Sequence, residues 1–421
     1  MTYKNTKQFS LQLDKEDELR KYRDEFYMPL QKNGEEHIYL CGNSLGLQAK
    51  RTKKFIDQEL EDWASLGVEG HFHAKNPWMP YHEFLTESYS KIVGAKHSEV
   101  VAMNTLTVNL HLMLVSFYRP TTLRHKIIIE ADAFPSDIYA VESHIKQHGY
   151  VVDKSLIKVK PRNGESSIRI EDIESIIKKE GSEIALIMLG GVNYYTGQVF
   201  NFQRITDLAQ KKGIFVGFDL AHAVGNIKLK LHKWGVDFAV WCSYKYLNSG
   251  PGSIAGVFIH ERHHDLDLPR FSGWWGHDKE SRFKMPNKFS PIKSAEGWQL
   301  SNPPILSLAA IRASLSVFDE VGMDRLIEKS KKLTGYLLFL LGSIQTDRIK
   351  IITPKERGCQ ISIRVKDGNK ELFDKITAKG VVADWREPDV IRVAPVPLYN
   401  SFSDVFNFCN ILKLAIHEER G

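Results

Sequence analysis

The sequence lacks the features that mark secreted, membrane-spanning and nucleic-acid-binding proteins. Only four cysteines occur among 421 residues and none forms a CxxC pair, so we expect no disulfide framework, no zinc site and a reducing, cytoplasmic environment. No apolar run approaches the roughly 18 residues of a membrane helix, and the polar N-terminus carries no secretory signal. The net charge of +6 is small for this length and no basic run contains interleaved aromatic residues, so we expect an anionic small molecule as ligand and no nucleic acid.

Helical and strand-like stretches alternate between about residues 46 and 260. We expect strands at 126–130, 151–159, 184–189, 214–218, 238–241 and 253–259, and helices at 46–66, 104–118, 136–147, 170–179 and 204–212. The strands are apolar throughout, which is typical of a parallel sheet covered by helices on both faces. The sequence therefore predicts an α/β domain with a mostly parallel sheet flanked by helices.

The pattern changes after about residue 305. Two long helices at 306–320 and 324–342, strands at 360–365 and 391–394 and a helix at 370–379 predict a smaller α+β domain. We therefore expect an N-terminal segment (1–55) that packs partly with the small domain, a large domain (56–305) and a small C-terminal domain (306–421).

Two apolar stretches end in side chains that carry chemistry. The run IFVGF leads directly into Asp219, and DFAVWC leads through Ser243 and Tyr244 into Lys245. Ligands of open α/β sheets bind outside the carboxyl ends of the strands, so we expect both side chains to face one crevice. A lysine amine forms a Schiff base with the aldehyde of pyridoxal phosphate, and a carboxylate keeps the pyridine nitrogen protonated so that the ring accepts electrons. Taken alone, Lys245 also fits a solvated lysine and Asp219 a helix cap.

Polar residues near two predicted helix starts fit the phosphate of such a cofactor. Leu106 and Thr107 lie near the start of the helix at 104–118 and offer backbone N–H groups and a hydroxyl to an anion. Phe134 follows the strand at 126–130 and can stack on the pyridine ring. Ser136 and Asp137 fit either this site or an ordinary helix cap, and the same is true of Thr107.

Two other motifs lack the context that their usual function requires. Residues 250–255 match the dinucleotide fingerprint G-x-G-x-x-A, but a strand-like run follows where a helix is needed, so a glycine turn fits better. His71 and His73 have no third ligand at a convincing spacing, so we expect no metal site there.

Ten segments between about Tyr39 and Phe406 resemble the kynureninase family. They are CGNSLGLQ (41–48), NTLTVNLHLML (104–114), FPSD (134–137), YYTGQ (194–198), DLAHAVGN (219–226), WCSYKYLNSGPG (241–252), GWWGH (273–277), RFKM (282–285), SNPPIL (301–306) and RVAPVPLYNSF (392–402). The resemblance implies a homodimer with the fold type I (aspartate aminotransferase) architecture and pyridoxal 5′-phosphate as cofactor. It also implies hydrolysis of the Cβ–Cγ bond of L-kynurenine or its 3-hydroxy derivative, giving L-alanine and anthranilate or 3-hydroxyanthranilate, in tryptophan catabolism or NAD biosynthesis.

The resemblance also implies roles for single residues. Lys245 is similar to the Schiff-base lysine and Asp219 to the partner of the pyridine nitrogen, and Tyr244 is the candidate for proton transfers at the substrate carbonyl. The remaining implied cofactor contacts are Leu106, Thr107, Phe134, Pro135, Ser136, Asp137, His222 and Tyr244, with Trp274 and Asn302 contributed by the second subunit.

Four positions are implied to bind the substrate: Ser44, His71, Asn302 and Arg392. A bidentate guanidinium suits the α-carboxylate, which is the role implied for Arg392. The nearest alternative is another enzyme of the same fold, such as an aminotransferase or a cysteine desulfurase. A desulfurase needs a mobile cysteine, and Cys359 has no strong claim to that role.

Overall fold

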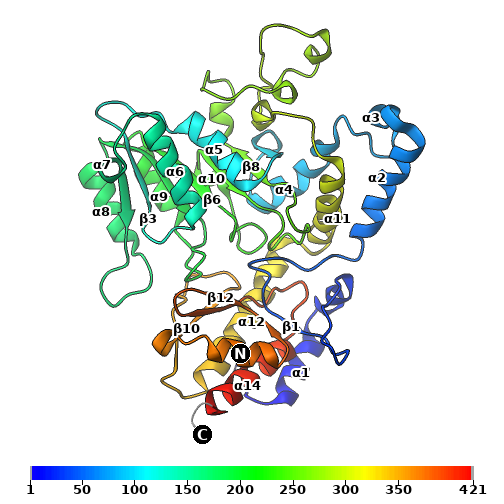
Figure 1. Cartoon of the computed structure of the whole chain (residues 1–421), viewed down its shortest axis with the longest axis vertical. Helices are drawn as coiled ribbons and strands as arrows, with labels where there is room; N and C mark the ends of the chain where they lie inside the picture. The colour runs from blue at the N-terminus through cyan, green and yellow to red at the C-terminus, as the bar shows by residue number, and fades with distance from the viewer. Residues whose placement is uncertain (1, 419–421) are drawn as a thin grey trace.

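The computed structural model describes residues 2–418. It has a larger and a smaller domain (Figure 1), and the larger one is built on a seven-stranded sheet. The strand order is β2 (Val100–Ala102), β8 (Gly256–Ile259), β7 (Phe238–Trp241), β6 (Phe215–Asp219), β5 (Ile184–Gly190), β3 (Lys126–Glu130) and β4 (Leu156–Val159). Strands β3 to β7 are parallel, whereas β8 runs antiparallel to both of its neighbours. The predicted mostly parallel sheet is confirmed.

Both faces of this sheet are buried. On β3, Ile128 joins one apolar core while Ile127 and Ile129 join the other, because successive side chains of a strand point to opposite faces. One core also contains residues of α8 (Ile170–Glu180), α9 (Phe202–Gln210) and α4 (Thr86–Val93), and the other contains residues of α5 (Leu106–Phe117) and α6 (Pro135–Gln147). Burial on both faces explains why the strands are apolar throughout.

The structure corrects two predicted elements. The helix expected from residue 46 begins six residues later, as α2 (Thr52–Leu66), and α3 (Gly70–His73) follows it. The preceding chain is not helical because Gly46 lies against the segment of Lys245, and its N–H donates to the carbonyl oxygen of Tyr244 at 2.8 Å. The strand expected at 151–159 begins with the single helical turn α7 (Val152–Ser155), and only β4 is extended. The glycine-rich residues 250–255 lead into β8 and not into a helix, which excludes the dinucleotide motif.

The smaller domain contains an antiparallel sheet, so the predicted α+β character is confirmed. Its strands are β12 (Asp384–Arg386), β13 (Val390–Val393), β10 (Ile361–Val365) and β9 (Ile349–Ile351), in that order, and its helices are α12 (Met323–Gly342), α13 (Glu371–Ala378) and α14 (Phe402–Glu418). The N-terminal segment packs here: α1 (Lys7–Glu16) lies on α14, and β1 (Ile38–Tyr39) pairs with β11 (Val381–Val382). A buried ion pair of 2.7 Å between Asp17 and Lys329 ties this segment to α12.

Helix α11 (Ile305–Val321) determines where the two domains divide. We expected the small domain to begin near residue 305, but α11 packs against α2, and its buried residues Leu308, Ile311 and Leu315 belong to the core of the large sheet. We therefore propose that the boundary lies at Gly322, between α11 and α12.

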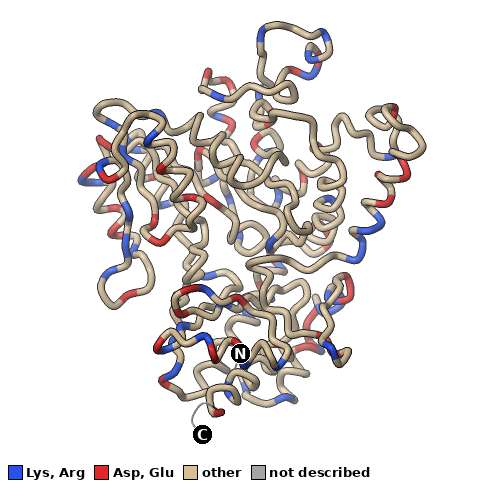
Figure 2. Tube along the Cα trace, in the orientation of Figure 1, with Lys and Arg blue, Asp and Glu red and all other residues tan. Residues whose placement is uncertain are grey.

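Charged residues of both signs, lysine, arginine, aspartate and glutamate, are spread along the described part of the chain (Figure 2). Among residues 2–418, no helix is both long enough and apolar enough to cross a membrane.

Candidate active site

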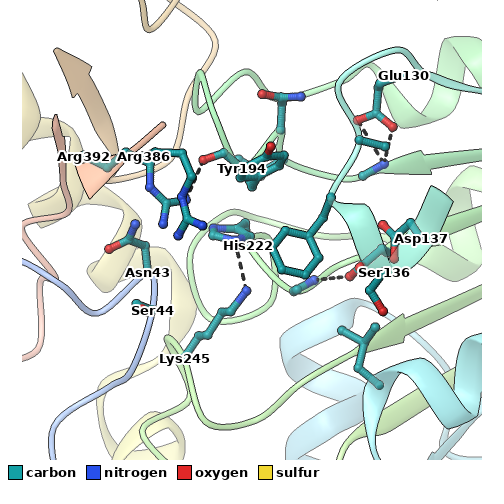
Figure 3. Close-up of a pocket in the computed structure, with 18 of the residues that line it drawn as sticks. Asn43, Ser44, Glu130, Ser136, Asp137, Tyr194, His222, Lys245, Arg386 and Arg392 are labelled. Atoms are coloured by element: carbon teal, nitrogen blue, oxygen red, sulfur yellow. Dashed lines mark hydrogen bonds between the residues drawn. The ribbon is translucent and has the colours of Figure 1, made fainter. Parts of the chain in front are cut away.

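A pocket of about 270 Å³ lies where the carboxyl ends of the large-domain strands meet the small domain. Its lining includes Lys245, Asp219, His222, Tyr244, Leu106, Thr107, Phe134, Ser136, Asp137, Ser44 and Arg392, all of which the sequence singled out. In Figure 3, Lys245 and His222 occupy the middle, with two arginines, Asn43 and Ser44 on one side and Ser136 and Asp137 on the other. The pocket therefore has two chemically different ends.

Lys245 and Asp219 reach this pocket from adjacent strands, as expected. Strand β6 pairs in parallel with β7, and Asp219 lies opposite Val240, so the residues that follow both strands emerge at one edge of the sheet. Asp219 is buried, and its Oδ1 accepts a hydrogen bond of 2.7 Å from the N–H of Ala221. Lys245 comes within 3.0 Å of the Nε2 atom of His222 (Figure 3).

His222 is a neutral partner for Lys245. Burial lowers the pKa of His222 well below its usual range, and the nearby positive charges of Lys245, Arg392 and Arg386 lower it further. A neutral imidazole can accept from the lysine ammonium through Nε2, which places its own proton on Nδ1. That Nδ1 atom is buried and has no hydrogen-bond partner among the described residues.

Three buried carboxyl groups lie close together beside the lysine. Burial raises the pKa of Asp137 well above its usual range, and the carboxylates of Asp219 and Glu130 add to the rise. Burial also raises the pKa of Asp219, and it raises the pKa of Glu130 to about 7. Glu130 ends β3, and both of its carboxyl oxygens accept from the N–H of Gly190, at 3.2 and 3.1 Å. A cationic ring nitrogen in this region would relieve the repulsion between these groups.

Two helix N-termini lie on the same side of the pocket as Asp137 (Figure 3). Thr107 lies in the first turn of α5 and Ser136 in the first turn of α6, and their hydroxyl oxygens are 2.8 Å apart. The N-cap residue of α5, Thr105, makes no side-chain capping bond, so the first N–H groups of the helix stay available for an anion. Phe134 precedes α6, and its ring meets that of Tyr194 edge-on at 5.4 Å.

The small domain contributes the cationic end. Arg392 is buried on β13, and its guanidinium donates to the carbonyl oxygen of Tyr194 at 2.8 Å and to Asp384 at 3.1 Å. Arg386, at the end of β12, also lines the pocket. Arginines suit carboxylate recognition because two parallel N–H bonds match the two oxygens.

Four of the predicted site residues do not line this pocket. His71 lies in α3, where its Nδ1 is 3.0 Å from the carbonyl oxygen of Val68 and its ring contacts Trp78 edge-on. Trp274 is 42% exposed, and Asn302 is exposed as well. Pro135 begins α6 without facing the cavity. Within one chain, therefore, the pocket does not include these residues.

Sequence reasoning missed several lining residues. Glu130, Tyr194, Arg386 and Asn43 all face the cavity. A signal was available for Glu130, since it ends an apolar strand just as Asp219 does. Asn43 follows no strand of the large sheet, and only its place beside Ser44 in the segment CGNSLGLQ (41–48) could have pointed to it.

The donors and acceptors of the pocket fit pyridoxal phosphate. Lys245 suits the aldehyde, the buried carboxylate of Asp219 suits a protonated ring nitrogen, and the helix N-termini at Thr107 and Ser136 suit the phosphate. Asp137 Oδ1 and His222 Nδ1 are buried without partners among residues 2–418, so a polar ligand between them has groups to satisfy.

Comparisons with known proteins agree with this geometry. The kynureninase of Myxococcus xanthus is 55% identical to this chain, covering 98% of it and 97% of the relative. The kynureninase of Flavobacterium psychrophilum is also 55% identical, covering 99% and 100%, and that of Nematostella vectensis is 48% identical, covering 97% and 94%. The chain belongs to the kynureninase family. Two family models match parts of the chain. The kynureninase C-terminal domain matches residues 326–412, and the DegT/DnrJ/EryC1/StrS aminotransferase family matches residues 79–235.

Solved structures with low sequence identity share the fold of this kynureninase-family chain. A cysteine desulfurase from Thermococcus onnurineus superposes with a TM-score of 0.76 at 16% identity, covering 91% of this chain and 95% of that one. A mutant of C-DES with glycine covalently linked to its pyridoxal phosphate gives 0.76 at 13% identity, covering 89% and 96%. The expected fold type I architecture is confirmed.

Proposed function

We propose that this chain is a kynureninase that uses pyridoxal 5′-phosphate to hydrolyse the Cβ–Cγ bond of L-kynurenine, 3-hydroxy-L-kynurenine or both. The products are L-alanine and anthranilate or 3-hydroxyanthranilate, which places the enzyme in tryptophan catabolism or NAD biosynthesis. The observation that carries the proposal is one pocket in which Lys245 and Asp219 emerge from adjacent strands and face Arg392 from the other domain. The high identity to curated kynureninases over nearly the whole chain supports it.

Each residue then has a defined task. Bound pyridoxal phosphate supplies an electron sink for charge that develops on the amino acid. Lys245 would hold the cofactor through its aldehyde, and its amine, placed in the same pocket, would move the Cα proton of the substrate. Asp219 keeps the ring nitrogen charged, and Arg392 binds the α-carboxylate. Tyr244, half-buried in the same pocket, is our candidate for proton transfer at the γ-carbonyl, where water adds before the bond breaks.

A product assay tests the proposal. The purified protein, supplied with cofactor, should release fluorescent anthranilate from L-kynurenine and no sulfide from L-cysteine. Sulfide release without anthranilate would instead indicate a cysteine desulfurase. Cys359 argues against that alternative, because it is buried and burial raises its pKa to about 12, so its thiolate is scarce.

We also propose a homodimer whose sites are completed across the interface by His71, Trp274 and Asn302 of the partner subunit. All three lie outside the pocket of their own chain, with His71 half-buried and Trp274 and Asn302 exposed, which supports this arrangement. Mixing Lys245→Ala and Asn302→Ala chains tests it: hybrid dimers carry one site with neither substitution, so part of the activity should return. No recovery after subunit exchange, verified by native mass spectrometry, would contradict shared sites.

Two further features follow from the proposal. His71 and Asn302 are polar, so a ring hydroxyl on the substrate would satisfy them, and we expect good acceptance of 3-hydroxykynurenine. A strong preference in kcat/KM for plain kynurenine would contradict this. The four unpaired thiols support a cytoplasmic location, which a fluorescent fusion imaged in cells would test.

A further inference from the structure

Two arginines and one aspartate share one face of a hairpin in the small domain. Strand β12 pairs antiparallel with β13, and Asp384 lies directly opposite Arg392. Arg386 is two residues beyond Asp384 on the same strand, so its side chain leaves the same face. The sheet register alone therefore places the three charges side by side.

Asp384 is hydrogen-bonded to both arginines. It accepts from Arg392 through Nε at 3.1 Å, and its other oxygen lies 2.8 Å from Nη2. The same carboxylate accepts from Nη2 of Arg386 at 3.2 and 3.1 Å. Both guanidinium groups also lie beside the ring of Tyr194, at 5.8 and 5.9 Å from its centroid.

The hydrogen bonds leave specific donors unused. A guanidinium has five N–H groups, and Arg392 gives two to Asp384 and one to the carbonyl oxygen of Tyr194. One N–H on each Nη atom remains, which is the arrangement that binds a carboxylate end-on. Arg386 keeps more: its Nε is buried without a partner among the described residues, and Nη1 makes no bond to Asp384.

Charge also favours an anionic ligand between these groups. Two guanidinium groups and one carboxylate give the trio a net charge of +1, and both arginines line the pocket that contains Lys245 (Figure 3). One carboxylate of the substrate neutralises the trio, whereas a neutral group leaves a partly buried charge unpaired.

We propose that Arg386 is a second residue that binds the α-carboxylate of the amino-acid substrate, and that Asp384 is the positioning residue that holds both arginines for it. This inference rests on the proposed function, in which Arg392 binds that carboxylate. Three N–H groups of Arg392 are engaged by Asp384 and Tyr194, whereas the side chain of Arg386 is 32% exposed and keeps more of its donors for the carboxylate.

Binding of two small ligands to the cofactor-loaded enzyme tests the assignment. L-alanine contains the amine and the carboxylate, and L-alaninamide contains the amine alone; each is titrated by the change in cofactor absorbance. We expect Arg386→Gln to raise the Kd of L-alanine at least tenfold and to leave the Kd of L-alaninamide within twofold. Asp384→Asn should act in the same direction through misplacement of both arginines. Arg386→Lys, which keeps the charge but loses the fork, should fall between the wild type and Arg386→Gln.

Arg364→Gln is the matched control. Arg364 lies on β10 of the same sheet and pairs with Asp389 at 3.3 Å, outside the pocket, so both Kd values should stay unchanged. Equal weakening of both ligands by Arg386→Gln, or an unchanged Kd for L-alanine, overturns the proposal. If Asp384→Asn does not fold, the Arg386 variants decide, since that side chain is partly exposed.

The outcome is separable from the proposed function. A wild-type enzyme that binds L-alanine in a carboxylate-dependent manner but releases no anthranilate from kynurenine would refute the kynureninase activity and leave the arginine assignment standing. If the wild type turns over kynurenine, and Arg386→Gln weakens binding of kynurenine but not of L-alanine, the kynureninase activity stands and the arginine assignment is refuted. Arg386 would then contact the ketone side of the substrate.

Discussion

The carboxylates around Lys245 allow a sharp test of how the pocket holds a charged ring nitrogen. Asp219→Asn and Asp137→Asn each remove one ionisable group while preserving shape. Asp219 is buried at the end of β6, and Asp137 lies in the first turn of α6 with its pKa raised by burial and by Asp219. Burial raises the pKa of both carboxyl groups, and the contact between them raises that of Asp137 further and lowers that of Asp219, so we expect Asp137 to hold the proton and Asp219 the charge.

The expected magnitudes follow from these environments. Removing one partner of a buried ion pair costs about 3–5 kcal/mol, so Asp219→Asn should lower kcat by roughly 10²- to 10⁴-fold. Asp137→Asn removes a group that is already neutral, and one hydrogen bond is worth about 1 kcal/mol, or roughly fivefold. In the Asp219→Asn background the repulsion on Asp137 disappears and its pKa falls, so it partly replaces the missing charge. In that background, Asp137→Asn should raise the activation free energy by about 1–2 kcal/mol beyond the effect of Asp219→Asn.

A double-mutant cycle measures this coupling. Initial rates of anthranilate release from saturating kynurenine give kcat for the four proteins, and cofactor absorbance verifies that each is loaded. Asp132→Asn, on the exposed part of the loop between β3 and α6, is the control and should change neither quantity. Effects that add within about 0.5 kcal/mol would refute the reasoning, as would an Asp137→Asn enzyme as impaired as Asp219→Asn.

Three further predictions address other groups in the site. Lys245→Ala should lose the Schiff-base absorbance, and retention of a covalent cofactor that borohydride can reduce would contradict the assignment. Arg392→Gln should raise KM for kynurenine at least tenfold, since hydrogen bonds to charged groups are worth about 1.5–3 kcal/mol each; a KM within twofold of the wild type would show that another group binds the carboxylate. The raised pKa of Glu130, about 7, means that its contribution to folding stability is fully present below pH 4.5 and is lost as the pH rises towards 7, so the gain in Tm from Glu130→Gln should be larger at pH 8 than at pH 5. Equal gains at the two pH values would contradict a raised pKa for the buried Glu130.

Much of the fold was predictable because the strands are buried on both faces. Continuous apolar runs between helices leave few arrangements other than a parallel sheet, and the rule for ligands at strand ends then joins Asp219 to Lys245. The same rule applied to β3 identifies Glu130. Short elements were less predictable: Val152–Ser155 forms a helical turn in a stretch with a strand-like pattern, and the close contact of Gly46 with the chain at Lys245 keeps the residues before Thr52 out of α2.

The small-domain part of the site depends on register, which the sequence specifies weakly. Asp384 and Arg392 become neighbours only once β12 and β13 are aligned, with residues 387–389 turning the chain between the paired residues Arg386 and Val390. The alternating pattern of DWREPDVIRV with a proline at its centre indicates a hairpin, and the charged residues then fall on one face. Neither the strand-end rule nor the sheet register accounts for Trp274 and Asn302, because both lie outside the pocket of their own chain.

The pocket takes its binding groups from two domains, and this has a thermodynamic consequence. Lys245, Asp219 and the helix N-termini belong to one body, and both arginines belong to the other, joined through the helix that begins at Met323. An amino acid bound at both ends connects the two domains, so its binding is coupled to the angle between them. A restraint that keeps the two domains apart should therefore weaken binding of the amino acid. Binding of the cofactor, whose proposed contacts lie in the large domain, should not change.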